Sequence, residues 1–348
     1  MDTAATPPRV DHEAQFNILV VGPSWVGDMV MAQSLFIMLK QQHPNSVIDV
    51  LAPAWSLPLL ARMPEVRRGI AMPLGHGQFG LIARYRLGRQ LQSEGYHQAI
   101  VLPNSWKSAL IPFFARIPLR TGYVGEVRWG LLNDARHLDK RQLAMTVQRF
   151  VALGMPLDTP KPLDFEAPRL SIQGIDQQTA IDKFGLHSDR PILALCPGAE
   201  YGPAKRWPME HFAALARHYD ERGWQVWLFG SEKDRAIAEV IDQLAGAICH
   251  NFAGKTTLAE VVDLMSLTNR VVSNDSGLMH VAAALDKKVI ALYGSSDPGF
   301  TPPLHAEAII LQHKMPCAPC FQRECPLGHT RCLTEIKPEQ VFNALESM

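Results

Sequence analysis

The sequence predicts an α/β protein made of two similar halves, each built around a parallel sheet. Short apolar runs recur along the chain and end at glycine or proline, as at Gly22-Pro23 and Pro197-Gly198. Continuous runs of this kind are typical of parallel strands that are buried on both faces. Segments of helical length separate them, which is the pattern of βαβ units. A Pro-rich stretch at about 158–169 interrupts the pattern, which then restarts.

Each predicted element follows from an apolar run or a helical spacing. In the first half we expect strands at 16–21, 47–51 and 99–102, and helices at 27–42, 81–93 and 108–115. In the second half we expect strands at 192–196, 226–229, 270–273 and 289–293, with helices at 208–221, 235–245 and 258–266. The predicted domains are 16–165 and 166–335, after a disordered polar leader at 1–15. A final helix over 336–348 is a candidate to pack back on the first domain.

Composition narrows the class of protein. The 348 residues, 47% of them hydrophobic, suffice for two separate cores. Basic and acidic residues number 34 each, so a general electrostatic attraction to nucleic acid is not expected. The chain has no apolar run of about 18 residues and no signal-peptide pattern. We therefore expect a cytoplasmic protein with reduced cysteines.

The segment 274–280 is the most informative one in the chain. It follows an apolar run and begins a helix, so free backbone N–H groups and the positive end of a helix dipole face an anion such as a diphosphate. Ligands of parallel sheets bind at the C-terminal ends of strands, so the site should lie in the cleft between the two halves. The Gly22–Asp28 loop is a second strand-to-helix turn. It lacks both the G-x-G-x-x-G fingerprint and a phosphate-loop lysine.

Asp28 has two interpretations. It can complement the dipole of its own helix, or it can act as a general base at the mouth of the cleft. Lys205 and Arg206 lie in the long loop 197–208 after a strand, where they are either solvated cations or phosphate ligands. The residues alone leave both pairs of alternatives open.

Two further polar residues have similar alternatives. Ser231 fits the N-cap of the helix that follows it, and a ribose or base could also lie against it. His280 can cap its own helix in the core, or contact a phosphate or sugar hydroxyl.

A cysteine cluster lies near the C-terminus, with His313 and His329 beside it. Its spacing, C-x2-C-x4-C-x6-C, can close a tetrahedral zinc site, although it is not a common zinc-finger pattern. An iron–sulfur cluster and a metal-free loop are the alternatives. The candidate ligands in the loop 313–332 are Cys317, Cys320, Cys325 and Cys332.

Three segments together resemble a known family. The loops 22–30, 197–208 and 274–284 look like those of the ADP-heptose:lipopolysaccharide heptosyltransferases, glycosyltransferase family 9, and most like its heptosyltransferase II branch. The resemblance covers about 17–303. It implies the GT-B fold, in which two Rossmann-like parallel-sheet domains face each other across a cleft. The N-terminal domain would hold the acceptor and the C-terminal domain the ADP-sugar.

The resemblance also implies a reaction. An inverting glycosyltransferase of this branch moves L-glycero-D-manno-heptose from ADP-heptose to the first heptose of the lipid A–Kdo inner core. The alternatives are heptosyltransferase I, another core ADP-heptose transferase, or a non-catalytic module that senses a nucleotide or metal. No cofactor is expected for catalysis, and a structural zinc remains an expectation from the cysteines. The partners expected are ADP-heptose, the lipid A–Kdo–heptose acceptor and the inner face of the inner membrane, which would be met peripherally through residues such as Trp106 and Phe113.

The expected site residues divide into three sets. The catalytic residues implied by the resemblance are Asp28, as base, and Lys205, on the donor phosphates. The expected donor-binding residues are Gly198, Ala199, Lys205, Ser231, Asp275, Ser276, Gly277, Leu278 and His280. The expected acceptor-binding residues are Ser24, Trp25, Asn104, Lys107, Arg120 and Arg128.

Overall fold

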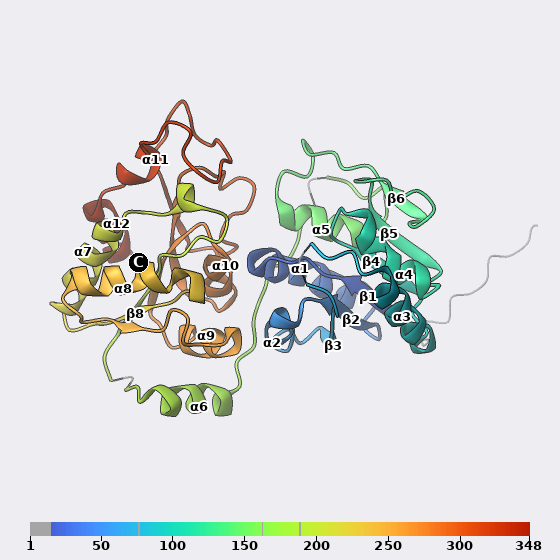
Figure 1. Ribbon diagram of the computed structural model, residues 1–348, viewed down its shortest axis with the longest axis horizontal. Helices are drawn as coiled ribbons and strands as arrows, with labels where there is room; N and C mark the ends of the chain where they lie inside the picture. Colours follow the sequence, from blue (N-terminus) through green and yellow to red (C-terminus); the bar gives the residue numbers. More distant parts are fainter. Residues whose placement is uncertain (1–14, 76, 162, 188) are drawn as a thin grey trace, which may run out of the picture.

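Two parallel six-stranded sheets form the framework of the protein (Figure 1). The structure is a computed structural model and describes residues 15–348 except 76, 162 and 188. In the first sheet the strand order is β3-β2-β1-β4-β5-β6. Its strands are β1 (Asn17–Val21), β2 (Val47–Ala52), β3 (Val66–Ala71), β4 (Gln98–Val101), β5 (Leu119–Tyr123) and β6 (Asp134–Arg136).

The second sheet repeats the topology of the first. Its order is β12-β11-β10-β7-β8-β9, so the first strand of each half lies beside the fourth. In such a doubly wound sheet the crossovers leave in opposite directions at that point, which opens a crevice for a ligand. The strands are β7 (Ile192–Cys196), β8 (Gln225–Leu228), β9 (His250–Asn251), β10 (Arg270–Asn274), β11 (Lys288–Tyr293) and β12 (Ile309–Gln312).

Helices cover both faces of each sheet. The first half contains α1 (Val26–Gln42), α2 (Leu57–Leu60), α3 (Leu81–Leu91), α4 (Leu110–Phe114) and α5 (Thr146–Gly154). The second half contains α6 (Gly174–Phe184), α7 (Met209–Asp220), α8 (Arg235–Ala245), α9 (Leu258–Met265), α10 (Gly277–Ala284), α11 (Arg331–Thr334) and α12 (Pro338–Glu346). Short 3-10 turns occur at Ala54–Ser56, Gln92–Glu94, Trp106–Ala109, Pro203–Lys205 and Glu232–Asp234.

The two faces of the first sheet have different neighbours. Ile18 and Val20 of β1 pack with Leu35 of α1 in the large cluster that continues into the second half. Leu19 and Val21 point to the opposite face, where a separate cluster lies under α3 and α4. Alternate residues of β1 thus enter two cores, which explains why the strand is apolar throughout. Figure 1 shows α3 and α4 on the side of the first half that is remote from the second half.

The predicted strands and helices are present, but the prediction was incomplete. The edge strands β3, β6, β9 and β12, the strand β5 beside β6, and the helices α2, α5, α6 and α11 were not predicted. The edge strands β3, β6 and β9 carry polar residues, and β3 exposes two arginines, so they lack a continuous apolar run. The expected return of the last helix to the first half is wrong, because α12 packs against α7 and β11. The predicted leader falls mostly on 1–14, outside the described residues. In the part of the chain that the structure describes, no helix has the length and apolar character needed to span a membrane.

Candidate functional site

The predicted site residues follow the strands that flank the two crevices. Asp28 and Asn104 follow β1 and β4, which are neighbours at the centre of the first sheet. Lys205 and Asp275 follow β7 and β10, which are neighbours at the centre of the second sheet. Because the carboxyl ends of parallel strands share one edge, each pair of loops lines one crevice. All four positions therefore have the topology expected of ligand-binding loops.

The two crevices face each other because α1 and α10 meet at their N-termini. A Cβ added to Gly27 would lie 2.6 Å from Cδ2 of His280, and one added to Gly277 would lie 2.7 Å from Cβ of Val26. Real Cβ atoms do not approach so closely, so both positions require glycine for the helices to touch. In Figure 1, α1 extends from the first half toward α10. This contact brings Asp28, one residue after Gly27, close to the second half of the molecule.

Asp28 has the electrostatic environment of a base. The pKa of its carboxyl group is raised to about 6, mainly by burial. The charge of Lys205 partly offsets this increase, and the charge of Asp275 adds to it. The influence of two residues of the second half shows that Asp28 faces that half. A carboxylate with a pKa near 6 is ionised at neutral pH and is a stronger proton acceptor than an ordinary aspartate.

Lys205 is held by a carboxylate that is itself held by a serine. Its ammonium group pairs with Oδ2 of Asp275, and Ser296 Oγ donates a hydrogen bond to the same oxygen at 2.5 Å. The ring of Tyr201 lies 5.2 Å from the ammonium nitrogen, and the guanidinium of Arg323 lies 5.0 Å from that ring. One cation is thereby fixed, and a second stands beside it, at the crevice of the second sheet.

A buried asparagine fixes the long loop to β10. Nδ2 of Asn274 donates to the carbonyl of Pro197 at 2.7 Å, and the amide of Trp207 donates to Oδ1 of Asn274 at 3.1 Å. Both ends of the loop 197–207 are therefore tied to the residue that precedes Asp275. The Trp207 ring is buried and anchors the same end of the loop in the second core. Lys205 is positioned by this framework.

Ser231 has the structural role that the sequence allowed as an alternative. Its hydroxyl and its amide both donate to Oδ2 of Asp234, at 2.7 and 2.9 Å. Asp234 also explains Gly198, where a Cβ would lie 2.5 Å from that carboxylate. Ala199 is buried, so only its backbone can face a ligand.

The N-terminus of α10 is open to an anion. Ser276 is the N-cap residue, and its side chain makes no capping hydrogen bond to the helix. The first four N–H groups of a helix have no partner within it, so those at 276–278 are available to an anion. Leu278 is half-buried against the core. Burial lowers the pKa of His280 to about 4, so this buried imidazole is neutral at pH 7.

The expected acceptor residues separate into two groups. Ser24, Trp25 and Asn104 are exposed, and Lys107 is half-buried. The two arginines are instead bound to backbone carbonyl groups. Arg120 donates to Leu131 and Ile117, and the buried Arg128 donates to Pro103 and Tyr123. Their guanidinium groups order the loops of the first sheet, which leaves them poorly placed for a ligand.

Sequence reasoning missed two groups near the crevice. Ser296 lies in the loop that follows β11, a strand for which the sequence suggested no site residue. The residues Tyr201 and Arg323 were missed because they come from separate loops. The segment of Phe321 and Arg323 binds the loop of Tyr201 through two backbone carbonyls. Tyr201 Oη donates to the carbonyl of Phe321, and the amide of Ala204 donates to the carbonyl of Arg323. Nothing in the local sequence indicates these contacts.

The cysteine cluster does not support a metal site. Among the described residues, no group of three or more His, Cys, Asp or Glu side chains is arranged to hold a metal ion. The four thiols do line one small pocket together with His329. Backbone hydrogen bonds from 327–330 lower the pKa of the Cys325 thiol, and burial raises that of Cys332. The predicted structural zinc is therefore unsupported, and the segment acts as the loop that contacts Tyr201.

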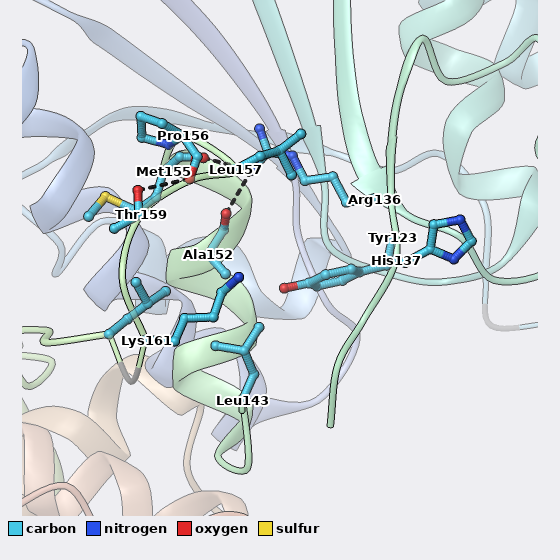
Figure 2. Close-up of a pocket in the computed structure, with 11 residues that line it drawn as sticks. Tyr123, Arg136, His137, Leu143, Ala152, Met155, Pro156, Leu157, Thr159 and Lys161 are labelled. Atoms are coloured by element: carbon cyan, nitrogen blue, oxygen red, sulfur yellow. Dashed lines mark hydrogen bonds between the residues drawn. The ribbon is translucent and has the colours of Figure 1, made fainter. Parts of the chain in front are cut away.

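A second pocket lies beside α5, away from these residues. Figure 2 shows Tyr123, Arg136 and Lys161 among the side chains that line it. Arg136 is bound to Asp134 and to the carbonyls of Ala152 and Met155, and the Tyr123 hydroxyl donates to the carbonyl of Arg149. The residues that line this pocket all belong to the first half, and none of them is a predicted site residue.

Comparisons with known proteins identify a family and a fold. The model of glycosyltransferase family 9 (heptosyltransferase) matches residues 84–331. The chain is 48% identical to lipopolysaccharide heptosyltransferase 2 of Salmonella typhimurium over 95% of this chain and 98% of that protein. It is 52% identical to lipooligosaccharide heptosyltransferase 2 of Haemophilus influenzae over 95% and 99%. The structure of Escherichia coli ADP-heptose heptosyltransferase II superposes with a TM-score of 0.83 at 44% identity, covering 95% and 98%.

Proposed function

Because the chain belongs to glycosyltransferase family 9, the heptosyltransferases, we propose that Asp28 and Lys205 catalyse heptose transfer from ADP-heptose across the cleft between the two sheets. The protein is a glycosyltransferase of the GT-B fold that acts in lipopolysaccharide core biosynthesis. The observation that carries the assignment of residues is the position of Asp28. It belongs to the first half, yet its pKa responds to Lys205 and Asp275 of the second half.

The chemistry is a single displacement with inversion. The hydroxyl oxygen of the acceptor attacks the anomeric carbon of the heptose as Asp28 accepts the hydroxyl proton. The bond from that carbon to the diphosphate oxygen breaks, and ADP leaves with the bonding electrons. Lys205 and the amides at the start of α10 stabilise the charge that develops on the diphosphate. Asp275 and Ser296 hold Lys205 in place. No metal cofactor takes part in the proposed reaction.

The proposed acceptor is the first heptose of the lipid A–Kdo inner core. The relatives with 46–52% identity are heptosyltransferases 2, whereas heptosyltransferase 1 of Pseudomonas aeruginosa is 26% identical. This difference favours the second transfer over the first. We assign the acceptor to Ser24, Trp25, Asn104 and Lys107, which belong to the segments that follow β1 and β4. Because lipid A anchors the acceptor, we place the enzyme at the cytoplasmic face of the inner membrane as a peripheral protein.

An acceptor series tests the proposal. Purified protein would receive ADP-heptose and delipidated Kdo acceptors that carry zero, one or two heptoses, and mass spectrometry would identify each product. We expect addition of one heptose to the acceptor that already carries one. Transfer to the heptose-free acceptor alone would reassign the protein to the first transfer, and no transfer to any acceptor would refute the proposed function.

A further inference from the structure

A cationic and apolar surface covers the outer side of the first half. Six large hydrophobic residues of this surface are more than a third exposed: Phe79, Leu81, Ile82, Tyr85, Trp106 and Phe113. We call them the outer apolar patch. They come from α3, the turn before it, and the segment that forms α4 and its preceding 3-10 turn. Exposed apolar residues that gather in this way mark an interaction surface, in contrast to the scattered ones on most proteins.

The patch is one rigid surface because its two segments are locked together. The rings of Phe79 and Trp106 lie 5.1 Å apart, and those of Tyr85 and Phe114 lie 5.3 Å apart. The buried Arg84 joins the segments by donating to the carbonyls of Phe79 and Lys107, at 2.7 and 3.1 Å. A single preformed face is therefore presented to a partner.

The charge around the patch is mostly positive. From residue 77 to residue 126 the chain carries the cations Arg84, Arg86, Arg89, Lys107, Arg116 and Arg120, against the acidic residues Glu94 and Glu126. Glu126 accepts a hydrogen bond from the amide of Trp106 at 3.0 Å. Arg86, Arg89 and Arg116 are exposed, and no ion pair involves them among the residues that the structure describes. In a protein of zero formal net charge, such an excess of cations is local. The partner of this face must be negatively charged and able to accept apolar side chains.

We propose that the outer apolar patch and its arginines dock the enzyme on an anionic phospholipid surface. Ile82 and Tyr85 would enter the boundary between headgroups and acyl chains, while Arg86 and Arg89, on the same helix, meet lipid phosphates. A second copy of this chain fits the face less well, since a symmetric contact would set its arginines against their equivalents. The inference builds on the proposed function, because an acceptor anchored in lipid requires the enzyme to work at a membrane.

The position of the patch agrees with the direction of the reaction. Trp106 lies two residues after Asn104, in the loop that follows β4, and β4 is the neighbour of the strand that leads to Asp28. The Trp106 end of the patch therefore belongs to the loop that carries the proposed acceptor residue Asn104. A membrane that contacts the patch would present the sugar headgroup of its glycolipid to that loop.

The test is co-sedimentation of the full-length protein with lipid vesicles. Wild type should bind vesicles that contain phosphatidylglycerol and bind pure phosphatidylcholine vesicles much more weakly. The double variant Arg86→Gln/Arg89→Gln should lose about twentyfold in partitioning, since each cation near such a surface contributes roughly fivefold. Ile82→Ser should lose about tenfold from the apolar contact. Ile175→Ser on α6, with an exposed isoleucine of the second half, and Arg217→Gln/Arg222→Gln are the matched controls and should bind like wild type.

A second measurement separates this inference from the proposed function. The patch variants should transfer heptose to a delipidated acceptor at the wild-type rate and lose activity on acceptor embedded in anionic vesicles. Wild-type binding by the patch variants, or equal binding of wild type to neutral and anionic vesicles, would overturn the inference. So would a dimer in sedimentation analysis that Ile82→Ser abolishes. Failure of wild type on the delipidated acceptor would instead refute the proposed function and leave vesicle binding unaffected.

Discussion

At the scale of single residues, Asp28 links catalysis to pH. Burial, as the main cause, raises the pKa of its carboxyl group to about 6. Because the ionised form is the base, kcat/KM should rise tenfold per pH unit below 6 and level off above it. The neutral His280, with a pKa of about 4, should add no step between pH 5 and 8. A pH profile of kcat/KM measures the titration of Asp28 and would reveal any step from His280. A value that is constant from pH 5 to 7 would contradict the assignment of Asp28 as the base.

The same pKa shift predicts a cost in stability. A carboxyl group whose pKa is raised in the folded state favours folding while it is protonated, and this contribution is lost as the pH rises from 3.8 to about 6. At pH 7 the ionised Asp28 therefore destabilises the fold, by about 2–3 kcal/mol at most. Asp28→Asn should raise the midpoint of thermal unfolding by a few degrees at pH 7 and by much less at pH 4. Scanning calorimetry measures the midpoint at both pH values. An increase of the same size at pH 7 and pH 4, or a decrease at pH 7, would contradict the effect of burial on Asp28.

Lys205 offers a direct test of the leaving-group site. Lys205→Met removes the cation and leaves Asp275 buried without its partner. We expect kcat to fall by about a hundredfold or more and the affinity for ADP to fall as well. Lys233→Met is the matched control, because Lys233 is exposed and pairs with the exposed Glu200. Steady-state kinetics and ADP calorimetry measure the two effects, and wild-type values for Lys205→Met would remove it from the site.

At the scale of elements, the strands determine where the site lies, and the loops after them carry its side chains. The strands β1, β7, β10 and β11 follow from their apolar sequences, and the glycine turns after them indicate where ligands bind. The loop 197–207 was predicted as a ligand-binding loop because it follows such a strand. Its actual conformation depends on Asn274 and on the carbonyls of Phe321 and Arg323, which are distant in sequence. Such contacts cannot be read from local patterns, and this also explains why the structural roles of Arg120 and Arg128 were not foreseen.

Gly202 tests the contact between the donor loop and the cysteine-containing loop. A Cβ at this position would lie 2.3 Å from the carbonyl oxygen of Arg323, so the backbone must shift. Gly202→Ala should displace Lys205 and raise KM for ADP-heptose several-fold, with a smaller change in kcat. Gly174→Ala is the control, because a Cβ at Gly174 would meet open space. Gly223→Ala would not serve, since the φ of Gly223 is positive. Steady-state kinetics measure KM for ADP-heptose in both variants. Equal KM values in Gly202→Ala and Gly174→Ala would show that this loop contact does not position Lys205.

At the scale of the whole molecule, a buried ion pair joins the halves on the side of the linker. Arg62, from the first half, donates to Oδ2 of Asp263 on α9 at 2.7 Å and lies 3.0 Å from Asp176 on α6. Both Arg62 and Asp263 are buried. With the contact between α1 and α10, this pair fixes the relative position of the two sheets. Sequence showed that there were two halves, but it gave no sign of this pair, whose members are 201 residues apart.

Arg62→Ala should therefore be strongly destabilising. The substitution leaves the buried Asp263 without its partner, a change that costs about 3–5 kcal/mol in comparable cases. Arg235→Ala is a control on the surface, because Arg235 pairs with the exposed carboxylates of Glu232 and Glu239. Denaturant unfolding measures the difference, and a loss below about 1 kcal/mol would show that the halves are held together elsewhere.

The central proposal is that Asp28 is the base that accepts the proton of the acceptor hydroxyl, which attacks a donor held by the other half. The most direct test compares wild type with Asp28→Asn, using heptose transfer to the mono-heptosylated acceptor and ADP binding by calorimetry. Glu210→Gln, which also changes an acidic residue in the first turn of a helix, is the control. We predict a loss of about a hundredfold or more in kcat with an ADP dissociation constant close to that of wild type. A normal rate in Asp28→Asn, or a rate loss explained by lost ADP binding, would contradict the account.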